Sequence, residues 1–302
     1  MSIEDIAALG AEEGTLTEAA EAATGGIWLR AFARNRLAVA GLAVIVALLA
    51  FSFAGPLLYH TDQVHTRLAM ETLPPGTGRP LGTDNVGYDE LGRLMTGGQT
   101  MLEVALGAAA VAVVVGVAWG AVAGYFGGLL DSVMMRVVDA FLAIPALLLL
   151  LFLATVYRPS VPMLIVVVGV TAWLVPARLI RAEALSLRSR EYVLAAKTMG
   201  VRAPVIIVRH IVTNCIGTIV VNATFQVADA ILVVAALSFL GLGISPPATN
   251  WGAMLSDGLN YTYSGFWWLT YPPGVAIVLT VVAFNLIGDG LRDAFGLDMR
   301  RR

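Results

Sequence analysis

Long apolar runs separated by short polar segments are the main pattern of the chain. Six runs approach the roughly 20 residues that an α-helix needs to cross a bilayer. They lie near residues 37–58, 104–125, 137–157, 161–177, 211–234 and 272–288, and the fourth and sixth are short. None shows the strict alternation of a membrane-barrel strand. The pattern therefore predicts an all-α polytopic membrane protein with six transmembrane helices.

The composition excludes an ordinary soluble domain. Of 302 residues, 58% are hydrophobic and 13% are charged, and the mean hydropathy is +0.80, values typical of membrane proteins. Cys215 is the single cysteine, so no disulfide framework is expected. The chain has no Gly-x-x-x-x-Gly-Lys-Ser/Thr sequence, and Lys197 is its only lysine. We therefore expect no ATP hydrolysis by this chain, and no histidine spacing predicts a metal site.

Basic residues divide unevenly between the two sides of the predicted bundle. With a cytoplasmic N-terminus, fifteen of the 19 fall on the inner side. The remaining four, Arg67, Arg79, Arg93 and Arg158, fall on the outer side. The positive-inside rule therefore predicts that both termini lie in the cytoplasm.

Three regions are expected along the chain. Residues 1–25 carry six acidic and no basic residues, the opposite of a secretory signal, so we expect a disordered leader and a retained first span. Residues 26–36 include Trp28, Phe32 and several arginines and predict an interfacial helix on the inner leaflet. Residues 37–302 form the expected transmembrane domain.

A basic segment, residues 178–209, separates the fourth and fifth apolar runs. Within it, Tyr192, Ala195, Ala196 and Met199 recur at helical spacing and predict one face with small residues at its centre. Such a face lets another protein approach the helix closely, and Gly200 lets the chain turn away. The pattern alone fits an ordinary basic loop equally well.

The order of several motifs resembles one family. Residues 191–200 read Glu-Tyr-Val-Leu-Ala-Ala-Lys-Thr-Met-Gly and are similar to the EAA loop of bacterial ABC importer permeases, in the dipeptide, oligopeptide and nickel subfamily. Further similar stretches are Arg-Asn-Arg-Leu-Ala-Val-Ala-Gly-Leu at 34–42, Leu-Gly-Thr-Asp-Asn-Val-Gly at 81–87, Gly-Tyr-Phe-Gly-Gly at 124–128, Leu-Ser-Phe-Leu-Gly-Leu-Gly at 237–243 and Asn-Leu-Ile-Gly-Asp-Gly-Leu-Arg-Asp at 285–293. The resemblance covers about residues 27–296 and is to the C-type permease subunit.

The resemblance implies a function and a set of partners. A type I importer permease fold is expected, with a coupling loop at 188–210 whose Glu191, Tyr192, Ala195, Ala196 and Gly200 contact a separate ATPase. The implied partners are a second permease subunit, one or two ATPase subunits that use ATP and Mg²⁺, and an extracytoplasmic substrate-binding protein, with no nucleic acid. The implied location is the bacterial cytoplasmic membrane, among its lipids. Dipeptides or oligopeptides are the expected cargo, with nickel chelates, glutathione or oligosaccharides as alternatives.

Some positions depart from the family pattern. Thr213 stands where proline is usual before Asn214, so a less kinked helix is expected after the loop. Tyr88, Gly92, Gln99 and Val234 replace the usual Arg, Ser, Arg and Glu. The usual Asp-Pro after residue 293 is also absent. These changes leave the expected fold intact and make the cargo harder to assign.

Acidic residues within predicted spans suggest a different class of transporter. An unpaired charge there costs about 2.5–3.5 kcal/mol, so Asp139 and Asp229 could serve an ion-coupled secondary carrier. The simpler expectation pairs Asp139 with Arg136, three residues earlier on one helical face. Asn285 and Asp289, in the last motif, complete the structural or pathway candidates.

Two further features concern packing and docking. Gly116, Gly120 and Gly124 recur every four residues and predict a close helix contact. Residues 59–101 and 241–271, rich in Pro, Gly and aromatic residues, are expected to offer an outer docking surface and to fold partly into the membrane edge, where Trp and Tyr concentrate.

Overall fold

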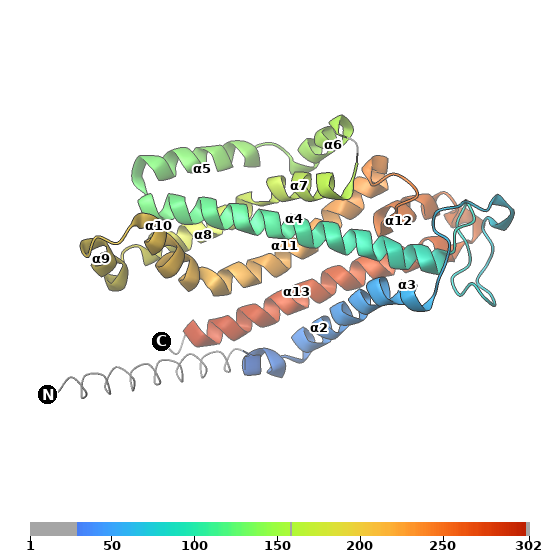
Figure 1. Ribbon diagram of the computed structural model, residues 1–302, viewed down its shortest axis with the longest axis horizontal. Helices are drawn as coiled ribbons and strands as arrows, with labels where there is room; N and C mark the ends of the chain where they lie inside the picture. The colour runs from blue at the N-terminus through green and yellow to red at the C-terminus, as the bar shows by residue number, and fades with distance from the viewer. Residues whose placement is uncertain (1–28, 158, 300–302) are drawn as a thin grey trace.

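Helices make up almost all regular structure in residues 29–157 and 159–299, the part of the chain that the computed structural model describes (Figure 1). In that part, β pairing is limited to isolated bridges at Gly76–Arg79 and Thr83–Asp89. The predicted leader, residues 1–25, lies outside the described residues. Of the predicted interfacial helix, residues 29–34 are helical, and Asn35 then caps the next helix with its side chain.

The helices follow one another in the order α2 (Arg36–Leu49), η1 (Ala50–Ala54), α3 (Gly55–Leu58), η2 (Leu68–Met70), α4 (Glu90–Phe126), α5 (Gly128–Leu142), α6 (Ala146–Val156), α7 (Val161–Ala172), α8 (Leu174–Leu187), α9 (Glu191–Thr198), α10 (Ala203–Ile206), η3 (Ile207–Val212), η4 (Thr213–Cys215), α11 (Ile216–Leu237), η5 (Ser238–Leu242), α12 (Trp251–Leu259), η6 (Thr262–Ser264), η7 (Trp267–Leu269) and α13 (Tyr271–Met299). Four stretches are long and apolar enough to cross a membrane: Arg36–Leu58, Glu90–Phe126, Ala203–Leu242 and Trp267–Gly296. The count rises to six if each of two bent pairs, α5 with α6 and α7 with α8, is one span.

Two predicted spans are broken in the structure. The expected span 137–157 is interrupted after Leu142, and α5 and α6 differ in direction by 78°. Pro145 precedes α6, and proline disfavours helical backbone at the residue before it. The expected span 161–177 bends by 43° at Trp173, between α7 and α8.

One predicted span is longer than expected. Instead of beginning near residue 104, α4 begins at Glu90 and runs for 37 residues. The Asp89 side chain accepts a hydrogen bond from the backbone N–H of Gly92 at 2.9 Å and so caps the helix. Polar residues at 96–100 lower the local hydropathy and conceal this first part of the helix.

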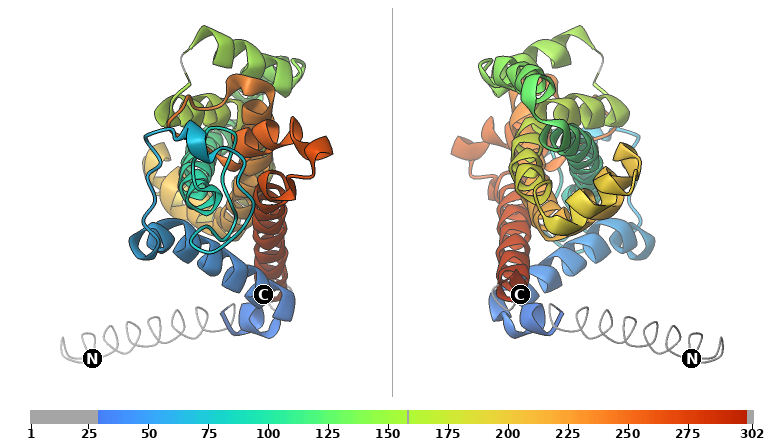
Figure 2. Two further views of the ribbon diagram at one scale, coloured as in Figure 1. Left: turned by 90° about the vertical axis from the view of Figure 1, so that its right-hand side faces the viewer. Right: turned by 90° about the vertical axis from the view of Figure 1, so that its left-hand side faces the viewer.

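α4 is central in the bundle, with α7, α8 and α11 packed against it and α13 packed between α11 and α2 (Figures 1 and 2). The glycine stripe confirms the expected close packing. A Cβ atom at Gly116, Gly120 or Gly124 would collide with Pro176, Ala177 or Ala184 of α8, respectively. The bundle has two ends (Figure 1). We call them the α9 end, which carries α9 and α10, and the loop end, which carries residues 59–89 and 243–270.

Candidate functional site

The short helix α9 lies at the α9 end and is held by two side chains. Val193 and Ala196 are buried, and they join a hydrophobic cluster with Tyr125 of α4, Ile180 of α8 and Ile207 of η3. The ammonium of Lys197 also lies 4.7 Å from the centre of the Tyr125 ring. α9 therefore rests on the ends of α4 and α8 by one narrow face.

The opposite face of α9 is uncovered. Glu191, Tyr192, Ala195 and Met199 are exposed, and Met199 has 75% of its surface free. Most of the predicted contact face is therefore open to another protein. Ala196 is the exception among the five expected contact residues, because it packs inward against this chain.

Gly200 ends α9 and turns the chain, as expected. Its φ of +77° is a conformation that L side chains rarely adopt. The N–H of Val201 donates to the carbonyl of Ala196 at 3.1 Å, and the N–H of Gly200 donates to that of Lys197 at 3.1 Å. This pair of bonds is the Schellman arrangement that closes many helices.

Arginines of the basic segment bind the helix α5. The Asp139 carboxylate pairs with Arg178 at 2.5 Å. The expected pairing with Arg136 is therefore wrong, because the partner comes from α8 and not from the preceding helical turn. Arg181 binds Asp131 through two hydrogen bonds of 2.5 and 2.7 Å. Part of the basic segment thus has a structural role.

A cavity of about 650 Å³ lies beside this end, between α8, the start of α11 and the end of α13. Its lining includes the Glu183 carboxylate, which accepts a hydrogen bond from Thr218. The Arg292 guanidinium also lines it and lies 5.1 Å from the centre of the Phe225 ring. The Asn222 side-chain oxygen is buried without a hydrogen-bond partner in the described part of the chain. The size and mixed lining suit a small polar ligand.

The four pathway candidates do not line this cavity. Asp139 is engaged by Arg178. Asp229 is exposed on α11 and has no ion pair among the described residues. Asp289 is exposed and Asn285 is half-buried on α13. In the described part of the chain, no hydrogen bond or ion pair joins any two of these four residues.

The segment around Thr213 is irregular. Residues Ile207–Val212 form a π-helical turn and Thr213–Cys215 a 3₁₀ turn. The Thr213 hydroxyl donates to the carbonyl of Val208 at 3.0 Å. Replacing proline by threonine here therefore does not produce a regular helix.

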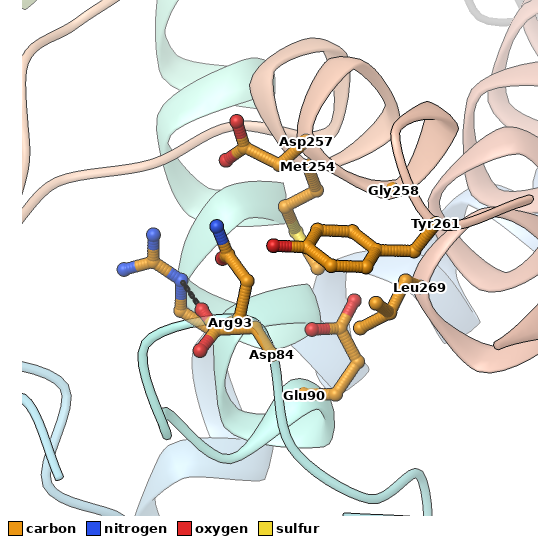
Figure 3. A pocket seen from close by; sticks show the side chains of 9 residues that line it. Asp84, Glu90, Arg93, Met254, Asp257, Gly258, Tyr261 and Leu269 are labelled. Atoms are coloured by element: carbon orange, nitrogen blue, oxygen red, sulfur yellow. Dashed lines mark ion pairs between the residues drawn. The ribbon is translucent and has the colours of Figure 1, made fainter. Parts of the chain in front are cut away.

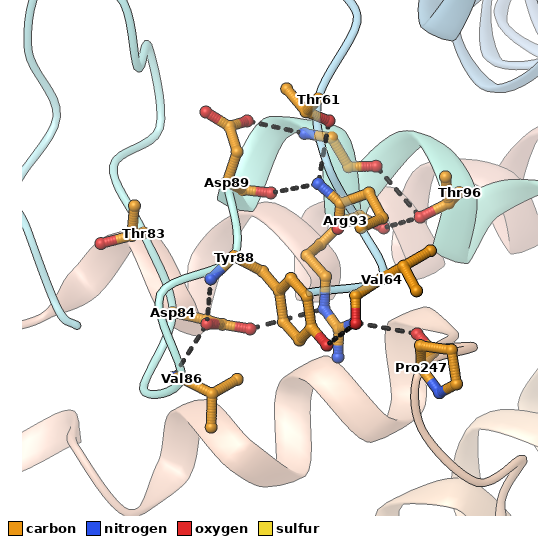
Figure 4. A network of polar contacts seen from close by, with 12 residues as sticks. Thr61, Val64, Thr83, Asp84, Val86, Tyr88, Asp89, Arg93, Thr96 and Pro247 are labelled. Atoms are coloured by element: carbon orange, nitrogen blue, oxygen red, sulfur yellow. Dashed lines mark hydrogen bonds and ion pairs between the residues drawn. The ribbon is translucent and has the colours of Figure 1, made fainter. Parts of the chain in front are cut away.

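Sequence reasoning missed a polar network at the loop end (Figure 4). Arg93 of α4 is 6% exposed, lies 3.4 Å from the Asp84 carboxylate and donates to the carbonyl of Pro247 at 3.1 Å. Its guanidinium also lies 4.4 Å from the centre of the Tyr88 ring. Asp84 accepts further hydrogen bonds from the N–H groups of Val86 and Tyr88. The network ties the loop before α4 to the segment after α11.

Burial is the largest influence on the loop carboxylates of this network. It raises the pKa of Asp84, although backbone N–H donors and Arg93 act in the opposite direction. Burial likewise raises the pKa of Asp257 on α12. The motif at 81–87 could have signalled a structured loop, but the distant partner Pro247 has no local sequence signal.

The chain matches known families over most of its length. Residues 116–301 match the family described as binding-protein-dependent transport system inner membrane component. Residues 25–75 match the N-terminal TM domain of oligopeptide transport permease C.

Two bacterial transport permeases are among the proteins similar to this chain. A dipeptide transport system permease of Bacillus subtilis is 39% identical over 90% of this chain and 85% of its own length. An oligopeptide transport system permease of Escherichia coli K12 is 40% identical over 88% of each chain. With an all-helical fold and four to six candidate membrane helices, the chain belongs to the family of binding-protein-dependent transport system inner membrane components, the permeases of ABC importers, and is of the C type.

Proposed function

We propose that this chain is a transmembrane subunit of an ATP-driven importer that passes dipeptides or oligopeptides across a bacterial cytoplasmic membrane. It pairs with a second, different permease subunit and receives its cargo from an external binding protein. One or two separate ATPase subunits bind ATP and Mg²⁺ and supply the energy, so this chain is not an enzyme. The names of the similar permeases support the cargo.

The exposed face of α9 carries the proposal. A helix that buries only Val193 and Ala196 and leaves Glu191, Tyr192 and Ala195 exposed is suited to enter a groove of another protein. In this proposal α9 is the coupling helix, and the movement of the ATPase reaches the bundle through the cluster under Val193.

The same proposal orients the molecule. The α9 end faces the cytoplasm, the loop end faces outward, and each bent helix pair counts as one of six spans. The distribution of arginines along the chain supports this orientation.

The 650 Å³ cavity is the proposed inner part of the peptide pathway. A short peptide is zwitterionic, and the lining offers the Glu183 carboxylate and the Arg292 guanidinium. Opposite charges at one cavity can bind both ends of such a peptide.

Binding-protein-stimulated ATP hydrolysis tests the proposal. The chain is co-expressed with the neighbouring ATPase, permease and binding-protein subunits, purified through a tag on this chain and assayed with and without dipeptides. We expect stimulation that is lost in Gly200→Trp and in Glu191→Lys. Gly128→Trp is the control, since Gly128 also has positive φ and open space around its Cβ position. Unchanged stimulation in both coupling variants would refute the role of α9.

A further inference from the structure

The loop end contains a small acidic pocket (Figure 3). Glu90 and Asp84 lie at its buried floor, while Asp257 and Tyr261 of the segment after α11 lie toward its accessible edge. The enclosed space is about 10 Å³, which holds roughly one water-sized group. The pocket is separate from α9 and from the large cavity.

Glu90 is the unexplained group of this pocket. Its side chain points into the space near the Tyr261 ring (Figure 3), and the residue is only 2% exposed. No hydrogen bond or ion pair joins its carboxylate to any other residue in the described part of the chain. An ionised carboxylate that is buried without a partner is costly, so either a proton or a cation must neutralise Glu90.

The arginine of the pocket does not supply that group. Arg93 is engaged by Asp84, by the Pro247 carbonyl and by the Tyr88 ring. With all three carboxylates ionised, one guanidinium leaves a formal charge of about −2, and the N-terminus of α4 offsets only about half a unit. The pocket therefore retains an excess of negative charge.

The size and the donor geometry select among cations. No group of three or more acidic, histidine or cysteine side chains within the described residues converges as metal ligands would. A primary ammonium group is about the size of a water molecule and carries three N–H donors. The acceptors that line the space are the Glu90, Asp84 and Asp257 carboxylates, the Tyr261 hydroxyl and the Asn85 side chain.

We infer that this pocket binds a primary ammonium group, with Glu90 as its principal acceptor. Two sources share this chemistry: a lysine of a protein docked at the loop end, and the free amino terminus of a peptide.

Esterification of Glu90 by a diazo compound, which reacts with carboxylic acids and releases N₂ but does not couple amines, measures the binding in the purified full chain in nanodiscs without any partner. Methylammonium is the probe, and tetramethylammonium, which has the same charge but no N–H donor, is the control. At ten times the Kd, methylammonium should slow the modification of Glu90 roughly tenfold, and tetramethylammonium should not. Equal rates with and without methylammonium would overturn the inference. That result is expected if Glu90 is simply protonated and binds no cation. Equal slowing by both ions would also overturn the inference.

Two variants separate the pocket from general surface charge. Asp257→Asn removes a negative charge at the edge of the pocket and should weaken methylammonium binding about tenfold. Asp62→Asn removes an exposed carboxylate of the same end and should leave it unchanged. Equal effects of both variants would contradict a specific site.

A second arm identifies the source and rests on the proposed function. In the assembled importer, slower modification of Glu90 with the binding protein alone indicates a lysine. Slower modification only with a peptide, and not with its N-acetylated form, indicates the peptide terminus. If neither the binding protein nor the peptide slows the modification of Glu90, in a sample that still shows stimulated ATP hydrolysis, the assignment of the pocket as an ammonium site would be overturned. Loss of that hydrolysis would instead contradict the proposed function.

Discussion

The ion pair of Arg93 with Asp84 and the ion pair of Arg178 with Asp139 lie in different surroundings. Asp84 and Arg93, at the loop end, are paired in the interior. Arg178 of α8 and Asp139 of α5 have side chains that are 52% and 47% exposed. A buried pair depends on a fixed geometry, because a separated charge would lie in a poor solvent, whereas an exposed pair contributes little to stability. The contacts of Arg93 are thus the more firmly fixed of the two.

Removing the charge at the centre of the loop end should have the largest effect. Arg93→Ala would leave Asp84 buried without its partner and should lower the free energy of unfolding by about 3–5 kcal/mol. Arg67→Ala is the control, because Arg67 is exposed and pairs with Asp62 at the surface. Its effect should stay below about 1 kcal/mol. Thermal unfolding of the purified chain measures both, and equal effects would remove the contrast between buried and exposed ion pairs.

The anchoring of α9 should show the next largest effect. Val193→Ala removes two buried methyl groups from the cluster under α9 and should cost roughly 2 kcal/mol. Leu194→Ala, on the adjacent exposed position, should change stability by less than about 0.5 kcal/mol. If the proposed coupling role holds, Leu194→Ala still reduces stimulated ATP hydrolysis. A Leu194 variant that is as unstable as the Val193 variant would contradict the exposed face.

Glycine substitutions test the turn after α9. Gly200→Ala and Gly128→Ala each place a methyl group in open space at positive φ, so each should cost about 1–2 kcal/mol of backbone strain. Thermal unfolding should show matched losses. Only the Gly200 variant should then reduce coupling, because Gly200 forms the turn after α9 whereas Gly128 lies at the start of α5. Equal losses of coupling would show that strain, and not the position of α9, matters.

The smallest expected effect is a pH dependence at the loop end. The pKa values of Asp84 and Asp257 are raised above the ordinary value of about 3.9. The native state therefore binds their protons more tightly than the unfolded state, and their contribution to stability falls as pH rises above that value. Asp62 behaves oppositely, because N–H groups of His65 and Val64 lower its pKa to about 2.

Unfolding midpoints measured across this pH range test the assignment. Asp84→Asn should flatten the fall of stability with rising pH above about 4. Asp62→Asn should change the stability profile only at acidic pH. The stabilising contribution of ionised Asp62 is present above its ordinary pKa and is lost as pH falls toward 2. A pH profile that is unaffected by Asp84→Asn would contradict the raised pKa of the buried Asp84 carboxylate.

Local patterns predicted the helices well and the long-range partners poorly. Apolar periodicity located the cores of the long helices, and the positive φ of Gly200 follows from its place after a helical segment. The start of α4 was missed although Asp89 is a good capping residue, because the hydropathy of the following turns is low. The change of direction before Pro145, within the expected third span, was not predicted.

The partners of the charged groups required the fold. Asp139 was expected to pair within its own helix, yet Arg178 is 39 residues away. The bond from Arg93 to Pro247 crosses 154 residues. Sequence spacing encodes neighbours along one helix, whereas these contacts depend on how separate helices pack.

The length of α4 has a mechanical consequence. At 1.5 Å per residue, its 37 residues extend about 55 Å, well beyond the hydrocarbon thickness of about 30 Å. Its first turns hold Arg93, and its last turn holds Tyr125 against Lys197 of α9. One continuous helix therefore joins both ends. The direction in which side chains point at one end is fixed relative to their direction at the other end. Inserting a single residue midway would rotate one end of α4 against the other by about 100°. The polar network around Arg93 and the contact of Tyr125 with α9 could then not both keep their present positions.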